Sequence, residues 1–251
     1  LWPSALGMPL GIMAGEPLYA FPNSTEEYLR VPGNKLKMVN GSYVLQFTTE
    51  LWETPYLDKI SLKVIDHPNK MNVYIDEAFT PPPFPSSKIY GVKEKYIPTK
   101  AMDSQGNDLI KKLKKRDNIY VSNLYHDLYQ GVTEFHDLVL EFENINSDDS
   151  LFLFLQGWLF PTDASINVNL SHSENLRSIF PYLQIPNENG TWETIIDNLG
   201  FPKGKNKTMV VDLTNRFNNH DYRIRLRTNM QIYWDHIFMA NSQSHNEIRV
   251  F

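Results

Sequence analysis

The sequence contains no cysteine, and this absence excludes several kinds of chemistry at once. Disulfide bonds, metal sites with thiolate ligands, covalently attached c-type haem and cysteine nucleophiles all need a residue that the chain does not have. The cellular compartment stays open, because cytosolic chains and many secreted bacterial chains both lack cysteine.

Long hydrophobic runs are missing as well. The longest apolar stretches, such as residues 151–160, reach about ten residues, whereas a membrane-spanning helix needs about 20. We therefore predict no membrane span. The first residues include neither a basic segment nor an initiator methionine, so they do not resemble a signal peptide. Because Leu1 and Phe251 look like residues from the middle of a protein, we expect a processed product or a piece of a longer polypeptide.

Neither sign of charge dominates the chain. The formal net charge of -5 comes from 24 basic and 29 acidic residues that are interspersed along the sequence. This pattern does not resemble a nucleic-acid-binding surface, and we predict no nucleic-acid partner. The 251 residues are 41% hydrophobic and 13% aromatic, which is enough to fill a real core and excludes global disorder.

Catalytic and metal-binding motifs are also missing. Residues 200–208 resemble a phosphate-binding loop, but three residues separate Gly200 from Gly204, and Asn206 follows Lys205, so a basic turn before a strand is the better interpretation. The seven histidines form no metal-binding motif, and no serine lies in a nucleophile elbow. Paired carboxylates for glycan hydrolysis stay open, because sequence does not give their separation in space.

Short alternations of apolar and polar residues dominate what is present. Residues 60–66 and 71–76 both alternate in this way and together predict a hairpin. Further strands are predicted at residues 43–49, 137–143, 151–158, 191–196, 208–213, 222–227 and 230–239. Many short strands separated by turn residues predict an all-β fold, an antiparallel β-sandwich or jelly roll.

Two other features divide the chain. One short helix is predicted at residues 107–116, whose lysines are either a solvated face or an anion site. The proline-rich stretch 80–87 predicts a linker. We predict three segments: an N-terminal β subregion packed on the main domain (1–92), a connecting segment with the helix (93–130) and the β-sandwich (131–251).

The arginines of the run YRIRLR are the first candidate ligand-binding residues. Strand alternation places Arg223, Arg225 and Arg227 on one face in steps of about 7 Å. Such a row suits carboxylate or sulfate groups of a polysaccharide or a partner protein. The alternative is that the arginines pair with cross-strand acids such as Asp212.

Two tryptophans near turns and one acidic loop complete the candidates. Trp158 and Trp192 are predicted to contact a glycan, although a buried aromatic core explains them equally well. Asp148 and Asp149, in the loop NINSDDS, are candidate ligands of a structural calcium ion, with a solvated turn as the alternative.

Glycosylation sites are predicted if the protein is secreted in a cell that glycosylates. The Asn-x-Ser/Thr motifs begin at Asn23, Asn40, Asn169, Asn189 and Asn206.

An Asp-His pair lies in the apolar run TNMQIYWDHIFMA. On a regular strand Trp234, His236 and Phe238 share one face and Asp235 points to the other, so Asp235 and His236 do not form a dyad with each other. We predict a strand buried on both sides. Asp235 is expected to be held by backbone donors or by an arginine of the neighbouring strand.

Whole phrases of the sequence resemble a known group of proteins. FTPPPFP, LYQGVTEFHDLVLEF, LFLFLQGWLFPTDASINV and RIRLRTNMQIYWDHIF are similar to the C-terminal region of FG-GAP/VCBS-repeat proteins of the ASPIC/UnbV and cartilage-acidic-protein-like group. The resemblance covers almost the whole chain. It implies an extracellular or periplasmic, non-catalytic β module at the end of a longer polypeptide, with upstream domains or sister subunits as partners. The calcium loop of the FG-GAP repeat is not present.

A looser similarity concerns PYLQIP, TWETII, TMVVDL and YRIRLR, which resemble galactose-binding-like jelly rolls. It implies loops at one end of the sandwich that bind sugars, commonly with a structural calcium ion. We therefore predict a non-catalytic binding or assembly module that contacts glycan, cell surface or partner subunits. The alternatives are a structural subunit of an extracellular filament or layer and, third, a glycan hydrolase.

Overall fold

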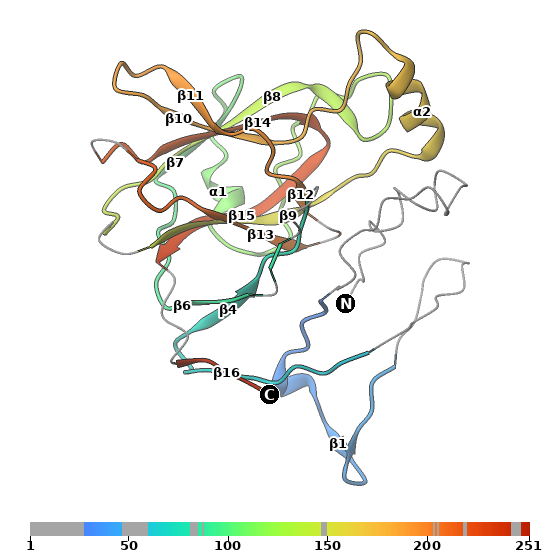
Figure 1. Ribbon diagram of the computed structural model, residues 1–251, viewed down its shortest axis with the longest axis vertical. Helices are drawn as coiled ribbons and strands as arrows, with labels where there is room; N and C mark the ends of the chain where they lie inside the picture. The colour runs from blue at the N-terminus through green and yellow to red at the C-terminus, as the bar shows by residue number, and fades with distance from the viewer. Residues whose placement is uncertain are drawn as a thin grey trace.

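The fold is an all-β sandwich, which confirms the predicted fold class. The computed structural model describes residues 28–46, 60–80, 85–86, 88–146, 150–202, 204, 206–217, 220–241 and 247–251. Two antiparallel sheets are stacked in it, one above the other in Figure 1. The upper sheet has the strand order β11-β10-β14-β8-β7, and the lower sheet has the order β13-β9-β15.

The upper, five-stranded sheet is apolar on its inner side only. Its strands are β7 (Lys100–Asp103), β8 (Val132–Glu141), β10 (Tyr182–Pro186), β11 (Trp192–Ile196) and β14 (Arg223–Met230). Leu138 and Leu140 of β8 and Ile224 and Leu226 of β14 are buried in the core between the sheets. The residues between them face outward, which is the pattern of an antiparallel sheet with one solvated side.

The lower sheet is buried on both sides. Its strands are β9 (Leu151–Leu159), β13 (Lys207–Asp212) and β15 (Ile232–Asn241). Leu153 and Leu155 of β9 belong to the core between the sheets, whereas Phe154 belongs to a second cluster on the outer side. Burial from both sides explains why β9 reads as a nearly continuous apolar run.

A small hairpin covers the outer side of the lower sheet. It pairs β4 (Asn72–Ile75) with β6 (Ile89–Val92) and lies below the sandwich in Figure 1. Phe154 stacks on Phe238 with ring centres 4.8 Å apart, and Tyr74 contacts both rings from the hairpin. This aromatic cluster fixes the hairpin on the sheet.

The predicted pairing of residues 60–66 with 71–76 is wrong. β3 (Ile65–Asp66) instead pairs with β16 (Arg249–Val250) close to the C-terminus, and β4 pairs with β6. The alternating residues Ile60, Leu62 and Val64 are more than half exposed and lie outside any strand. Alternation indicates which side of a strand is apolar, but it does not select the neighbouring strand.

Short elements close the sides of the sandwich. The pair β5 (Ala78–Phe79) and β12 (Phe201–Pro202) lies beside β13, and its two phenylalanine rings stack 4.9 Å apart. A 3-10 turn (Gly33–Lys35) and the hairpin of β1 (Met38–Val39) with β2 (Ser42–Tyr43) form the lower tip of the molecule in Figure 1.

The described residues form two α-helices, one more than predicted. The predicted helix at 107–116 is the single turn α1 (Ile110–Leu113), which buries Leu113 between the two sheets. The additional helix, α2 (Ala164–His172), begins at Asp163, whose carboxylate accepts a hydrogen bond from the backbone N–H of Ile166 at 2.8 Å. Its sequence lacks an apolar stripe. Within the described residues, no helix is long and apolar enough to cross a bilayer.

Two carboxylates protect the free edge of β13. The backbone N–H groups of Val210 and Thr208 donate to Asp76 Oδ1 at 3.1 Å and to Glu77 Oε2 at 3.2 Å. Lys207 Nζ also lies 2.8 Å from Glu77 Oε1 and donates to the Tyr28 carbonyl at 2.7 Å. These contacts satisfy donors that an edge strand otherwise leaves open.

A β-bulge in β15 changes the predicted faces. Trp234 is opposite Gly157, and His236 is opposite Gln156, so Asp235 is the extra residue. The alternation therefore shifts, and the assignment of His236 and Phe238 to the Trp234 face is wrong. A Cβ atom on Gly157 would lie 2.5 Å from the Tyr233 carbonyl oxygen, so this close approach of the backbones requires glycine.

The predicted segment boundaries remain a prediction. β7 lies in the segment 93–130 yet belongs to the five-stranded sheet. Residues 81–84 and 87 of the predicted linker are outside the described residues.

Candidate functional site: a cleft at one end of the sandwich

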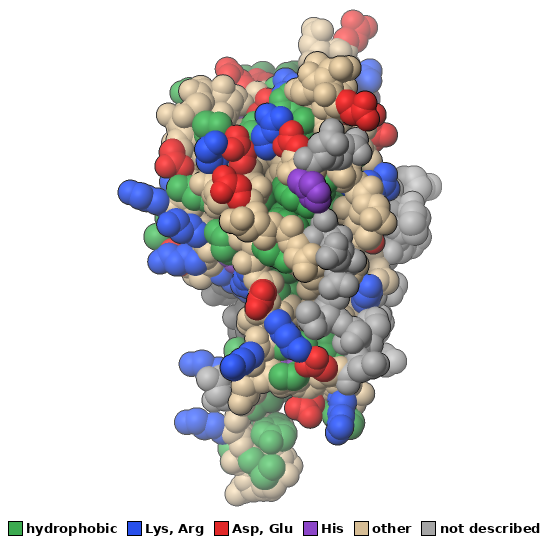
Figure 2. All heavy atoms as spheres, turned by 90° about the vertical axis from the view of Figure 1, so that its left-hand side faces the viewer, with side chains coloured by type: hydrophobic (Ala, Val, Ile, Leu, Met, Phe, Trp, Pro, Cys, Tyr) green, Lys and Arg blue, Asp and Glu red, His purple; other side chains and the backbone are tan. Residues whose placement is uncertain are grey.

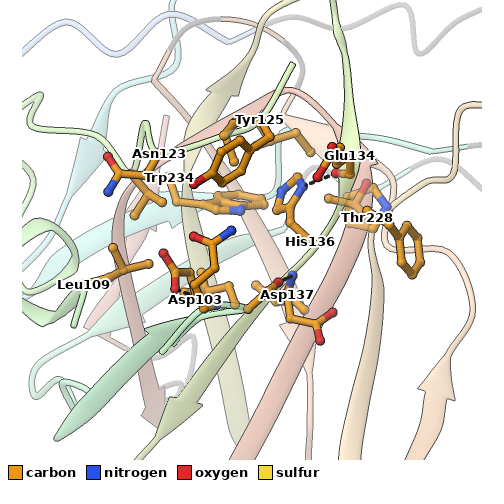
Figure 3. A pocket seen from close by; sticks show the side chains of 18 residues that line it. Asp103, Leu109, Asn123, Tyr125, Glu134, His136, Asp137, Thr228 and Trp234 are labelled. Atoms are coloured by element: carbon orange, nitrogen blue, oxygen red, sulfur yellow. Dashed lines mark hydrogen bonds between the residues drawn. The ribbon is translucent and has the colours of Figure 1, made fainter. Parts of the chain in front are cut away.

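A cleft opens where β7 ends and β8 begins (Figure 3). Its floor is apolar and consists of Leu109, Val121, Leu138, Leu226, Ile232 and Trp234. Its rim is mostly polar and includes Asp103, Ser104, Gln105, Asn123, Tyr125, Glu134, His136 and Thr228. The cavity volume of about 50 Å³ accommodates a few water-sized groups, so a larger ligand would insert only one part of itself.

The loop that carries Tyr125 is fixed at both ends. The backbone N–H of Val121 donates to the Trp234 carbonyl at 2.8 Å, which ties the loop to β15. The N–H of Glu134 donates to the Tyr125 carbonyl at 2.8 Å, which ties it to β8. The Tyr125 side chain is nevertheless 58% exposed, whereas Trp234 is 3% exposed. An accessible ring therefore borders a cleft whose floor is a buried indole (Figure 3).

His136 presents one nitrogen to the cleft. Its Nδ1 lies 3.1 Å from the Glu134 carbonyl oxygen and 3.1 Å from Thr133 Oγ1. Since a carbonyl oxygen only accepts, Nδ1 carries the hydrogen and Nε2 is the acceptor. Burial lowers the pKa of His136, which favours the neutral ring at neutral pH. Nε2 has no hydrogen-bond partner within the described chain and can accept from a ligand hydroxyl.

Two of the three acids around the cleft have structural roles. Burial opposes ionisation of Asp103, but hydrogen bonds from Asn107 and Gln105 outweigh it and lower the Asp103 pKa. Asp137 forms ion pairs with arginines of β14. Glu134 is exposed, and its carboxylate contacts no donor in the described residues. It is the rim acid that remains available to a ligand.

The predicted arginine row is present on the outer side of the five-stranded sheet. Arg223 pairs with Asp221 at 2.5 Å, whereas Arg225 and Arg227 lie 3.8 Å and 3.0 Å from Asp137. Each arginine therefore has an acidic neighbour, but only Asp137 is a cross-strand acid of the kind that the pairing alternative expected, and Asp212 is not among the partners. Asp137 is opposite Arg227 in the β8–β14 register, whereas Asp212 lies in the other sheet.

The two predicted tryptophans lie on different sheets. Trp192 of β11 comes beside Arg225, whose guanidinium is 4.8 Å from the indole centre. Trp158 is on the outer side of the lower sheet, where its ring stacks on Tyr233 at 4.8 Å and meets Tyr120 and Phe160 edge-on. The structure thus unites Trp192 with the arginine row and separates Trp158 from it.

The remaining predicted site residues are the candidates for calcium binding and glycosylation. Asp148, Asp149 and Asn23 are outside the described residues. Asn40, Asn169 and Asn189 are exposed. Asn206 is half-buried, and its amide accepts from Tyr120 Oη and donates to Asn118 Oδ1, so a glycan there would break both bonds. No three histidine or acidic side chains among the described residues are grouped to hold a metal ion.

The sequence interpretation missed the cleft itself. One signal was readable: if Leu138 and Leu140 face inward, alternation turns His136 inward too, towards the open end of the sandwich. The position of Tyr125 beside the cleft depends on contacts between its loop and distant parts of the chain, and these contacts leave no pattern in the sequence. No protein-family model and no curated protein matches the chain.

Proposed function

We propose that this chain is a non-catalytic binding module, the C-terminal part of a longer secreted protein, which binds one sugar residue of a glycan at the mouth of the cleft and admits one edge of that sugar into it. The observation that carries the proposal is the grouping of an exposed tyrosine, a free imidazole nitrogen and a free carboxylate around an apolar floor: Tyr125, His136, Glu134 and Trp234. A sugar offers a C–H face to an aromatic ring and hydroxyl donors to the acceptors.

The roles of the cleft acids favour binding over hydrolysis. A glycosidase needs two carboxyl groups about 5 to 10 Å apart, one of them able to donate a proton. Asp103 is held by its own turn, and Asp137 neutralises arginines, so both are committed elsewhere. Of the three acids, only Glu134 has a carboxylate without a partner in the described residues, which suits recognition of a hydroxyl group.

An assembly role is the second candidate, because one exposed apolar surface favours it. The hairpin of β1 and β2 exposes Met38, Val39, Tyr43 and Val44, each by more than half. Figure 2 shows hydrophobic side chains gathered at this lower tip. If the hairpin mediates assembly, sedimentation velocity should show concentration-dependent association that Val44→Lys removes; a monomer at every concentration would contradict this role.

The sugar-binding proposal is tested by replacing Tyr125. The chain is screened against a glycan array with galactose-, N-acetylglucosamine-, fucose- and uronate-terminated oligosaccharides, and hits are titrated calorimetrically. Tyr125→Ala is expected to weaken binding at least about tenfold, because the sugar loses its stacking surface. The melting temperature should not change, since the Tyr125 side chain is exposed.

Tyr43→Ala is the matched control, because Tyr43 is 52% exposed but lies far from the cleft, on β2. It should bind like the parent chain. Glu134→Gln should weaken binding without changing stability. Equal affinities of the parent chain and Tyr125→Ala, or no bound glycan at all, would refute the proposed function.

A further inference from the structure

Two arginines beside the cleft share a single acid. Arg225 and Arg227 both pair with Asp137, and their side chains are 16% and 33% exposed. Arg223, on the same face, has Asp221 to itself, with contacts of 2.8 Å at Nε and 2.5 Å at Nη2. The pair of Arg225 and Arg227 therefore keeps one positive charge that its local acid does not neutralise.

The shared ion pair also leaves donors unused. Arg227 Nε lies 3.0 Å from Asp137 Oδ1, yet the two atoms are not aligned as a hydrogen bond. Arg225 uses Nε to donate to Gln184 Oε1 at 2.7 Å, and its Nη1 is 3.8 Å from Asp137, too far for a hydrogen bond. Within the described residues, the terminal guanidinium nitrogens of both arginines donate no hydrogen bond.

Aromatic rings hold both guanidinium groups in place. Arg225 lies 4.8 Å from the centre of the Trp192 ring, and Arg227 lies 4.6 Å from that of Phe135. Phe135 in turn is 6.2 Å from the ring of Tyr182. Such stacking reduces the entropy that the arginines lose when they bind an anion. Burial also lowers the pKa of Arg225, so its cation gains from an additional anion.

The arginine pair is continuous with the cleft. Phe135 and Asp137 belong to the cleft lining and also contact the arginines, while His136 between them faces the cleft. Figure 3 places Asp137 next to His136 on the same strand. A glycan chain that places the edge of one unit in the cleft can therefore cross β8 and bring its next unit to Arg225 and Arg227.

We propose that Arg225 and Arg227 bind the carboxylate of an acidic sugar, so that the ligand is a polysaccharide containing hexuronate. This inference rests on the proposed function, because it assigns the sugar class of the same site. The planar forks of two guanidinium groups match the planar carboxylate, and its single negative charge balances the single unneutralised positive charge. Trp192 and Phe135 flank the position with apolar surface for the sugar rings.

The test compares an acidic oligosaccharide with its uncharged methyl ester. Tetragalacturonate and its fully methyl-esterified form are titrated into the chain by calorimetry. The acid is expected to bind at least about tenfold more tightly than the ester, and this preference should fall at high salt. Arg227→Gln should remove the preference. Arg227→Lys should restore only part of it, since lysine keeps the charge and loses the fork.

Arg223→Gln is the control, because Arg223 shares the strand and the face but has its own acid. It should retain the full preference. Asp137→Asn should strengthen binding of the acid several-fold by releasing both arginines, a gain that misfolding cannot produce.

The results that would contradict this inference differ from those that would contradict the proposed function. Equal binding of acid and ester that still depends on Tyr125 would overturn this inference and leave the proposed function intact. Binding of a sulfated galactan tetrasaccharide at Arg227 in place of tetragalacturonate would overturn the carboxylate assignment. No binding of any of these probes would overturn the inference. The proposed function would fall as well only if no glycan on the array bound or if Tyr125→Ala bound its glycan like the parent chain.

Discussion

Asp235→Ala is expected to lower the free energy of unfolding by about 3 kcal/mol, whereas Asp235→Asn should stay within about 1 kcal/mol of the parent chain. Asp235 is 1% exposed. Its Oδ1 accepts hydrogen bonds from the backbone N–H groups of Asp117 and Asn118, each at 3.1 Å. Alanine leaves both donors without an acceptor. Asn118 has a positive φ of 63°, so the turn has little freedom to find new partners.

Asparagine separates the hydrogen bonds from the charge. It keeps an acceptor at the position of Oδ1 and removes a carboxylate whose pKa is raised by burial. The asparagine amide nitrogen takes the place of Oδ2, which has no hydrogen-bond partner in the described part of the chain. The cost of burying this amide group without an acceptor nearly cancels the gain from removing the buried charge.

Urea unfolding followed by tryptophan fluorescence and circular dichroism measures the difference. Asp66→Ala is the control, because Asp66 is an exposed aspartate on β3 and should change stability by less than about 0.5 kcal/mol. Sugar binding should be the same in Asp235→Asn as in the parent chain. If Asp235→Ala kept full stability but lost sugar binding, Asp235 would serve the cleft and the structural role would be wrong.

The environment of Asp235 shows what the alternation of apolar and polar residues predicts and what it does not. The sequence correctly separates Asp235 from His236 and correctly expects backbone donors as one of two partners. The faces are wrong beyond Trp234, because one extra residue in the bulge shifts the alternation. A bulge depends on the facing strand, here on Gly157, and leaves no mark in the sequence of β15 itself.

The arginine row shows that alternation predicts the face of a side chain but not its partners. Alternation places Arg223, Arg225 and Arg227 on one face, and the structure confirms it. Their acidic partners require the strand order, since Asp137 lies beside β14 and Asp212 lies in the other sheet. The strand order likewise brings Trp192 to Arg225. Side-chain type and face were therefore predictable, whereas the grouping of these residues into one surface was not.

Replacing Asp76 or His236 by asparagine should change stability with opposite dependences on pH. Burial raises the pKa of Asp76 from 3.8 to about 6 in the folded chain, so the ionised carboxylate is less stable in the fold than in the unfolded chain. Hydrogen bonds from the backbone N–H groups of Val210 and Ala78 lower this pKa and offset burial only in part, whereas the neighbouring charge of Glu77 raises it. Asp76→Asn keeps an acceptor for both N–H groups and should stabilise the chain by about 2 kcal/mol above pH 7. This advantage should shrink as the pH falls through 6 towards 3.8.

His236 behaves in the opposite way. Burial lowers its pKa from 6.5 to about 4, and the nearby cations Lys95 and Arg116 also oppose its protonation. The unfolded chain therefore binds the proton first, and stability is lost as the pH falls from about 6.5 to 4, by about 2 kcal/mol at pH 5. His236 Nδ1 lies 2.9 Å from the Leu113 carbonyl and acts as its donor. His236→Asn supplies an amide donor in that place and does not titrate.

Urea unfolding of the parent chain, Asp76→Asn and His236→Asn at pH 5, 6, 7 and 8 compares the two groups directly. The stability difference between Asp76→Asn and the parent chain should be largest at pH 8. The difference between His236→Asn and the parent chain should become more favourable by about 2 kcal/mol as the pH falls from 8 to 5. Because all other carboxylates and histidines are common to the three proteins, their titration cancels in these differences. Two parallel pH profiles would mean that at least one of these side chains is solvated in the folded chain, and the variant whose difference does not change with pH would identify it.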